Sequence, residues 1–167
     1  MQIKKQLLAV VSLAIGVHAI GQTSCVSFKS SSSSIPVVQN GKGAQVFTSS
    51  DDLGGVHRAV QDFVSDVQKV TGITPHVSNV TSTIKSSDTP IIIGTLGESS
   101  LISAIVNHTK LDVSSIEGQW EAYLSREIQN PLPGISKAYV IIGADKRGSI
   151  FAIYDHSEQM GVSPWYW

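Results

Sequence analysis

Two short, continuous runs of apolar residues constrain the fold of this chain more than any other feature of its sequence. The first is Ile91-Ile92-Ile93, and the second extends from Ala138 to Ile142. Runs that are apolar at every position are typical of strands buried on both faces of a sheet. Both faces are buried only when other elements pack on each side of the sheet, so the two runs predict a layered α/β domain.

Three further segments have the apolar spacing of amphipathic helices. They extend from Val56 to Val70, from Leu101 to Val106, and from Ile150 to Ser157. In the first, apolar residues recur at the i, i+4, i+7 and i+8 positions of one helical face. We expect Asp51-Asp52 to cap the N-terminus of this helix and Gly72 to end it.

Shorter β-prone stretches complete the predicted sheet. Thr74 to Val80 and Glu121 to Ile128 are predicted to be strands, and the turn-rich Asn40-Gly41-Lys42-Gly43 predicts a hairpin. Residues Asn130 to Gly134, with two prolines, are predicted to form a turn, and Gly143 to Gly148 a turn from the second buried strand into the third helix. The fold class is therefore α/β, with a layered sheet of about five to six strands and three helices.

The N-terminus has the pattern of a secretory signal peptide. Lys4-Lys5 is followed by the apolar run Leu7 to Val17 and then by small residues at Ala19 and Gly21. The alternative is a membrane anchor, but the apolar part is shorter than the roughly 20 residues that a span needs. We expect residues 1–21 to be a signal peptide, cleaved after Ala19 or Gly21, and the protein to be secreted with no membrane partner.

Residues 22–34 are predicted to be a serine-rich linker, and residues 35–163 to be the folded domain. The linker contains Cys25, the only cysteine, so no disulfide can form within the chain. The residues before Cys25 lack the apolar residue of a lipoprotein leader. We therefore expect this cysteine to be an uninvolved residue of the N-terminal segment and not a lipid anchor. Asn79-Val80-Thr81 and Asn107-His108-Thr109 are glycosylation acceptor sequences, relevant only in a eukaryotic host.

Composition excludes several classes of ligand. Twelve Lys and Arg against thirteen Asp and Glu give a net charge of -1, so the chain has no basic field for nucleic acid. The spacing of Gly143 to Gly148 matches no dinucleotide or phosphate-loop motif, and no cofactor is expected. Four histidines fall in four different elements without a neighbouring cysteine, so no metal site is expected. These are His57, His76, His108 and His156.

No catalytic residue is evident from the sequence. Asp155 and Glu158 lie three residues apart on the third helix, and Asp145 precedes that helix. Carboxylates at this spacing are usually solvated, whereas acid-base catalysis requires a cleft and a shifted pKa. Two interpretations of Trp165-Tyr166-Trp167 stay open: these aromatic residues stack on sugars, or they begin a further structural unit.

Three segments resemble the N-terminal region of glycoside hydrolase family 115, which comprises secreted xylan α-1,2-glucuronidases. They are Ile116 to Tyr123, Asn130 to Gly134 and, above all, Gly143 to Trp167. Two positions depart from the family pattern: Ala152, where glycine is expected, and His156, where leucine is expected.

The resemblance implies an accessory α/β domain like those that precede glycosidase (β/α)8 barrels. It assigns the catalytic carboxylates to that barrel, with residues 164–167 as its expected start, and implies that this chain is inactive alone. The leading hypothesis is thus an accessory domain or fragment of a secreted xylan α-1,2-glucuronidase, a hydrolase that releases glucuronic or 4-O-methylglucuronic acid from glucuronoxylan. The alternative is a freestanding carbohydrate-binding or structural domain, with Trp120 and the three terminal aromatic residues as the sugar-stacking candidates.

Overall fold

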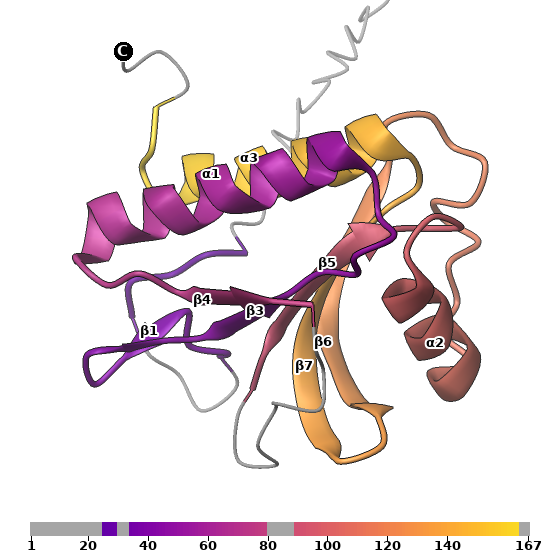
Figure 1. Ribbon diagram of the computed structural model, residues 1–167, viewed down its shortest axis with the longest axis horizontal. Helices are drawn as coiled ribbons and strands as arrows, with labels where there is room; N and C mark the ends of the chain where they lie inside the picture. The colour runs from indigo at the N-terminus through magenta and orange to yellow at the C-terminus, as the bar shows by residue number, and fades with distance from the viewer. Residues whose placement is uncertain (1–24, 30–33, 80–88, 164–167) are drawn as a thin grey trace, which may run out of the picture.

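The computed structural model of the protein describes residues 25–29, 34–79 and 89–163. Within these residues a five-stranded mixed sheet is covered by helices on both faces, and a separate two-stranded hairpin lies beside it. Helices α1 and α3 lie side by side over one face, and α2 covers the other (Figure 1). The predicted α/β class is therefore confirmed. In chain order the elements are β1 (Val38–Gln39), β2 (Lys42–Gly43), β3 (Gln45–Phe47), α1 (Gly54–Thr71), β4 (His76–Ser78), β5 (Ile91–Thr95), α2 (Ser100–Thr109), β6 (Tyr123–Leu132), β7 (Ile135–Gly143) and α3 (Lys146–Gln159).

The strands of the main sheet lie in the order β4-β3-β5-β7-β6. β4, β3, β5 and β7 are parallel to one another, and β6 runs antiparallel to β7. Because the parallel strands point the same way, the ends of β3, β5 and β7 meet at one edge, which we call the carboxyl edge. The helix that follows each of these strands starts at this edge.

The two apolar runs form the centre of the sheet, as their sequence predicts. In β5, Ile91 and Ile93 pack in the cluster under α1 and α3, whereas Ile92 packs in the cluster under α2. β7 alternates in the same way, with Ile141 on the first face and Val140 on the second. Side chains alternate across a strand, so a strand with a helical layer on each face must be apolar throughout. None of the described helices is both long and apolar enough to cross a membrane.

Helix α1 confirms the helix predicted from Val56 to Val70, but its start differs from the expected one. Gly72 ends the helix in the left-handed conformation, with φ of 75°, and donates its N–H to the Gln68 carbonyl. The residue at the N-cap position is Leu53, so the expectation that Asp51 or Asp52 caps this helix is wrong. The Asp52 carboxylate instead accepts hydrogen bonds from the N–H groups of Leu53 and Thr95, at 2.7 and 2.9 Å. Asp52 therefore connects the start of α1 to the end of β5 through these two hydrogen bonds.

The hairpin and the proline-rich turn are also present, with different limits. β1 and β2 form the predicted hairpin around Asn40-Gly41, whereas the apolar residues that follow enter the main sheet as β3. β6 continues to Leu132, so the predicted turn over residues 130–134 is too long. The pairing shifts register between Gln129 and Leu132, and this bulge accommodates Pro131, which has no N–H to donate to the ladder.

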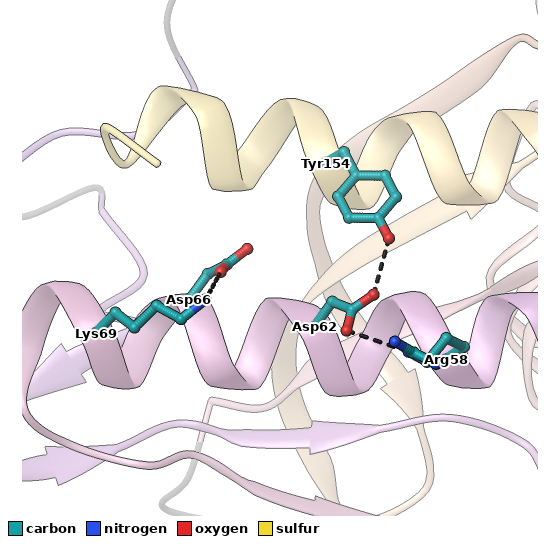
Figure 2. Close-up of polar contacts among 5 residues, drawn as sticks. All are labelled: Arg58, Asp62, Asp66, Lys69 and Tyr154. Carbon is teal, nitrogen blue, oxygen red and sulfur yellow. Dashed lines mark hydrogen bonds and ion pairs between the residues drawn. The ribbon is translucent and has the colours of Figure 1, made fainter. Parts of the chain in front are cut away.

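Polar side chains join the two helices that share a face of the sheet (Figure 2). The Tyr154 hydroxyl on α3 donates to Oδ2 of Asp62 on α1 at 2.8 Å, and Arg58 Nε lies 3.3 Å from the other carboxylate oxygen. One turn further along α1, Lys69 pairs with the buried Asp66 at 3.2 Å. Asp62 thus receives one hydrogen bond from each helix.

Candidate functional site

The turn from Gly143 to Gly148 lies at the carboxyl edge of the sheet, where ligands commonly bind in α/β folds. As predicted, it connects β7 to α3, and Asp145 caps the helix. Asp145 Oδ1 accepts the Gly148 N–H at 2.7 Å, and Oδ2 accepts the Glu121 N–H at 3.1 Å. These backbone hydrogen bonds, first that from Gly148, lower the pKa of the Asp145 carboxyl group. Arg147 pairs with the Glu121 carboxylate at 2.8 Å.

The glycines of this turn permit close packing of the backbone. A Cβ on Gly143 would lie 2.1 Å from the Ser149 nitrogen, and a Cβ on Gly148 would lie 2.2 Å from the Ala122 carbonyl oxygen. The Ser149 hydroxyl in turn lies 2.8 Å from the Thr95 hydroxyl on the neighbouring strand. The space around the turn is filled by the protein's own atoms, so the glycines serve packing.

The rest of the carboxyl edge is internally hydrogen-bonded in the same way. The hydroxyl groups of Ser49 and Ser100 lie 2.8 Å apart, and the Asp51 carboxylate accepts the Ser100 N–H at 3.3 Å. Hydrogen bonds from Ser49 and Ser100 lower the pKa of Asp51. These interactions fasten the loop after β3 to the start of α2, which is a structural role.

The carboxylates considered for catalysis do not form a reacting pair. Asp155 Oδ2 accepts hydrogen bonds from the Tyr123 hydroxyl at 3.0 Å and the Gln159 amide at 2.7 Å. Glu158 is exposed on the last turn of α3, and Asp145 caps the opposite end of that helix. Across the described residues, none of these three faces another over a cleft.

A concave feature lies at the opposite edge of the sheet, near the start of β5. A cavity of about 520 Å³ is bounded by the N-terminal segment, the start of β5 and the end of α3. Val37, Ile91 and Met160 contribute apolar surface to it, and Cys25 and His156 contribute polar groups. The cavity thus brings a concave surface together with the titratable side chains of Cys25 and His156.

Cys25 reaches this cavity through contacts with the end of α3. Gln159 Oε1 accepts hydrogen bonds from the backbone N–H groups of Cys25 and Val26, at 2.6 and 3.2 Å, and from the Cys25 thiol at 3.1 Å. Cys25 Sγ, a carboxylate oxygen of Asp155 and a ring nitrogen of His156 all lie within 4.8 Å of one another. We call these three residues the Cys25 cluster. Partial burial is the main factor that raises the pKa of the Cys25 thiol.

His156 is buried, with 5% of its surface exposed, and both of its ring nitrogens have partners. Nδ1 lies 2.7 Å from the Ala152 carbonyl oxygen, and Nε2 lies 3.0 Å from the Tyr139 hydroxyl. A carbonyl only accepts, so Nδ1 bears the proton and Nε2 accepts from the tyrosine. Burial lowers the pKa of His156 and raises the pKa of Tyr139 to about 12. At neutral pH the imidazole is therefore neutral and the phenol protonated.

The Cys25 cluster could not be found from the sequence. Cys25 and Gln159 are 134 positions apart, and no motif spacing relates them. The only local signal is His156 itself, which stands where the family resemblance leads us to expect leucine. A buried histidine needs a hydrogen-bond partner, and Tyr139 on the adjacent strand provides one.

The remaining sequence-predicted sites are surface positions or lie outside the described residues. Asn79 and Asn107 are both exposed, as glycosylation acceptors must be. Trp120 is 76% exposed on the loop before β6. The signal peptide and the aromatic residues Trp165, Tyr166 and Trp167 lie outside the part of the chain that the structure describes.

Comparison with solved structures relates the fold to glycosidases. The chain matches a family GH115 4-O-methyl-α-glucuronidase, BtGH115A, which has specificity for decorated arabinogalactans. The match has a TM-score of 0.56 and 25% sequence identity over 78% of this chain. The chain is a glycosidase-related domain. It spans 15% of the length of BtGH115A.

A weaker structural match is to CpGH84D, with a TM-score of 0.47 and 14% identity over 72% of this chain and 18% of that one. No protein-family model matches the chain, and no curated protein matches its sequence.

Proposed function

We propose that this chain is the accessory α/β domain of a secreted α-glucuronidase that removes glucuronic or 4-O-methylglucuronic acid branches from xylan. The observation that carries the proposal is the structural match to a GH115 glucuronidase over 78% of the chain at 25% identity. The resemblance of Gly143 to Trp167 to the N-terminal region of that family supports the same assignment. Secretion rests on the leader pattern of residues 1–21.

The internal chemistry of the domain supports a non-catalytic role. Glycoside hydrolysis ordinarily needs two carboxyl groups across the scissile bond, about 5 to 5.5 Å apart for retention and about 6.5 to 9.5 Å apart for inversion. Asp145 is occupied in capping α3, and Asp155 in bonds to Tyr123 and Gln159. The reacting carboxylates would therefore belong to a barrel domain, and this domain would support that barrel.

An activity assay tests the non-catalytic assignment. Purified chain is incubated with glucuronoxylan, and released uronic acid is measured by ion-exchange chromatography. We expect no release above buffer. Release that disappears in Asp155→Asn or Glu158→Gln would show that the domain itself is catalytic and would overturn the assignment.

The polysaccharide is tested with the complete reading frame. The coding sequence is extended beyond Trp167, and the product is assayed on glucuronoxylan and on decorated arabinogalactan in parallel. Several hundred further codons and uronic acid release from glucuronoxylan would support the proposal. Release from arabinogalactan alone would support the glucuronidase assignment but contradict xylan as the substrate. The substrate would then be a decorated arabinogalactan, the class for which BtGH115A has specificity. A stop codon directly after Trp167 would contradict the accessory role.

A freestanding carbohydrate-binding domain is the second candidate, because Trp120 is a large aromatic side chain with 76% of its surface exposed. Aromatic faces of this kind stack on sugar rings. Affinity electrophoresis through glucuronoxylan distinguishes the two functions. Retardation of the purified chain that is lost in Trp120→Ala would favour the binding domain, and unretarded migration would favour the accessory domain.

A further inference from the structure

We propose that Cys25, Asp155 and His156 form a zinc-binding site beside the cavity, a function separate from the accessory role. The three side chains supply one sulfur, one oxygen and one nitrogen donor, and the ligand atoms lie within 4.8 Å of one another. Zinc accepts all three donor types and takes a tetrahedral set of ligands. Three protein ligands would leave the fourth position for water.

His156 already has the arrangement of a metal-binding histidine. Its Nδ1–H donates to the Ala152 carbonyl oxygen at 2.7 Å, which directs the Nε2 lone pair away from its own helix. In metal-ligating histidines, a hydrogen bond from the ring nitrogen that does not bind the metal fixes the tautomer and the ring orientation. The Tyr139 hydroxyl lies 3.0 Å from Nε2. When zinc binds Nε2, this hydroxyl loses its hydrogen-bond acceptor and stays protonated.

Asp155 is held in place by contacts that leave one of its oxygens for the metal. The Tyr123 hydroxyl and the Gln159 amide both donate to Oδ2, and they come from β6 and from the last turn of α3. Among the described contacts of this carboxylate, Oδ1 receives no hydrogen bond. Carboxylates that ligate metals are commonly hydrogen-bonded in this manner.

We expect Cys25 to be the ligand that moves when zinc binds, because it lies outside the helices and strands. Tetrahedral zinc with bonds of about 2.0 to 2.3 Å places its ligand atoms roughly 3.3 to 3.8 Å apart. The ligand atoms of the cluster lie within 4.8 Å of one another, so the widest separation exceeds this range by at most about 1 to 1.5 Å. Cys25 lies in an irregular, exposed segment, and its thiol donates a hydrogen bond to Gln159 at 3.1 Å and also interacts with the Tyr139 hydroxyl. A small shift of this segment closes the site without disturbing α3 or the sheet.

Charge and protons balance in this reaction. The Cys25 thiol loses its proton to solvent as the Zn–S bond forms, and His156 binds as the neutral imidazole. The thiolate and the Asp155 carboxylate each bring one negative charge, which together neutralise Zn²⁺. A neutral complex is compatible with a half-buried position, where an uncompensated charge would be costly. Because a proton is released, zinc affinity should fall as the pH is lowered.

The test is a zinc titration of the full chain, stripped of metal and with its thiol reduced, in competition with a chromophoric chelator. We expect one equivalent of zinc to bind. Cys25→Ser, His156→Gln and Asp155→Asn should each weaken the affinity by at least about 10-fold, the loss that follows removal of even an outer partner of a metal ligand. His108→Gln and Glu158→Gln are the matched controls, because both side chains are exposed, and should bind zinc like the unchanged chain.

A cobalt substitution makes the result independent of folding effects at the buried histidine. Cys25 is exposed, so Cys25→Ser should keep its circular dichroism spectrum. Co²⁺ bound to the unchanged chain should show a thiolate-to-cobalt charge-transfer band, and Cys25→Ser should lack it. Failure of the unchanged chain to bind zinc, or equal affinity in Cys25→Ser, would overturn the proposal. Neither result depends on the glucuronidase assays, so the two proposals succeed or fail separately.

Discussion

Tyr139 on β7 donates its phenolic hydrogen to Nε2 of His156 on α3 across 3.0 Å. The two rings meet edge-on, with centroids 5.7 Å apart and planes inclined at 67°. This pair links the sheet to the C-terminal end of α3, whereas the Asp145 cap holds its N-terminal end. Helix α3 is thus held at both ends, and the contact at its C-terminal end depends on the protonation state of His156.

The first prediction follows from the lowered pKa of His156. Its ordinary pKa is 6.5, and burial lowers the value in the folded state. The unfolded chain then binds a proton at a higher pH than the folded chain, so the stability from this group is present above about pH 6.5 and is lost as the pH falls below it. We expect the free energy of unfolding to decrease from about pH 7 to pH 5 more steeply in the unchanged protein than in His156→Leu.

Urea denaturation of both proteins at each pH measures this difference. His108→Gln, altered at an exposed histidine, is the control and should retain the steep dependence. Parallel pH curves for the unchanged chain and His156→Leu would show that His156 has no such role.

The second prediction concerns the close approach of α3 to the loop before β6. Gly148→Ala should destabilise the protein by about 1 to 3 kcal/mol, because the new Cβ would overpack a filled space. It would lie 2.2 Å from the Ala122 carbonyl oxygen, a backbone atom that cannot rotate away. Thermal unfolding measures the change. Gly54→Ala at the start of α1 is the control, since nothing lies within 4 Å of its Cβ, and it should be neutral or stabilising by up to about 1 kcal/mol.

The third prediction concerns the polar contact between the two helices on one face of the sheet. Tyr154→Phe removes the 2.8 Å hydrogen bond to Asp62 and should cost about 0.5 to 1 kcal/mol, in the lower part of the usual range because Tyr154 is 44% exposed. Chemical denaturation measures the loss. Arg58→Ala, which removes the other partner of Asp62, should cost less than about 0.5 kcal/mol because that pair is solvated. Equal stability of Tyr154→Phe and the unchanged protein would contradict a stabilising role for this bond.

The fourth prediction concerns the leader. We expect the mature chain to begin at Ile20 or Gln22, because a positive segment, an apolar run and small residues occur in that order. Mass spectrometry of secreted material identifies the N-terminus. An intact Met1 would contradict secretion through this leader. Either expected product retains Cys25, so the zinc titration applies equally to the mature chain.

The two central strands and the helices that cover the sheet were predictable because their signals are local, whereas β3 was expected in the hairpin and instead pairs with β4 and β5. Ile91 to Ile93 is apolar at each position, and the repeat from Val56 to Val70 matches one helical face. Gly72 ended α1 as expected, since few residues other than glycine adopt the left-handed conformation there. The cap of α1 was mispredicted for the opposite reason: Asp52 had a more distant partner, the N–H of Thr95, which a local rule does not include.

Sequence alone thus determined the layered α/β class, the two central strands and the turn that leads into α3, because hydrophobic periodicity and turn chemistry act over a few neighbouring residues. Only the tertiary structure decided which polar groups meet. It brings Cys25 to Gln159 across 134 positions and places His156 against Tyr139, and it closes the carboxyl edge with its own hydrogen bonds. Those contacts depend on the order of the strands and on how the helices pack on the sheet. This arrangement forms only when the apolar surfaces of the whole domain are buried together.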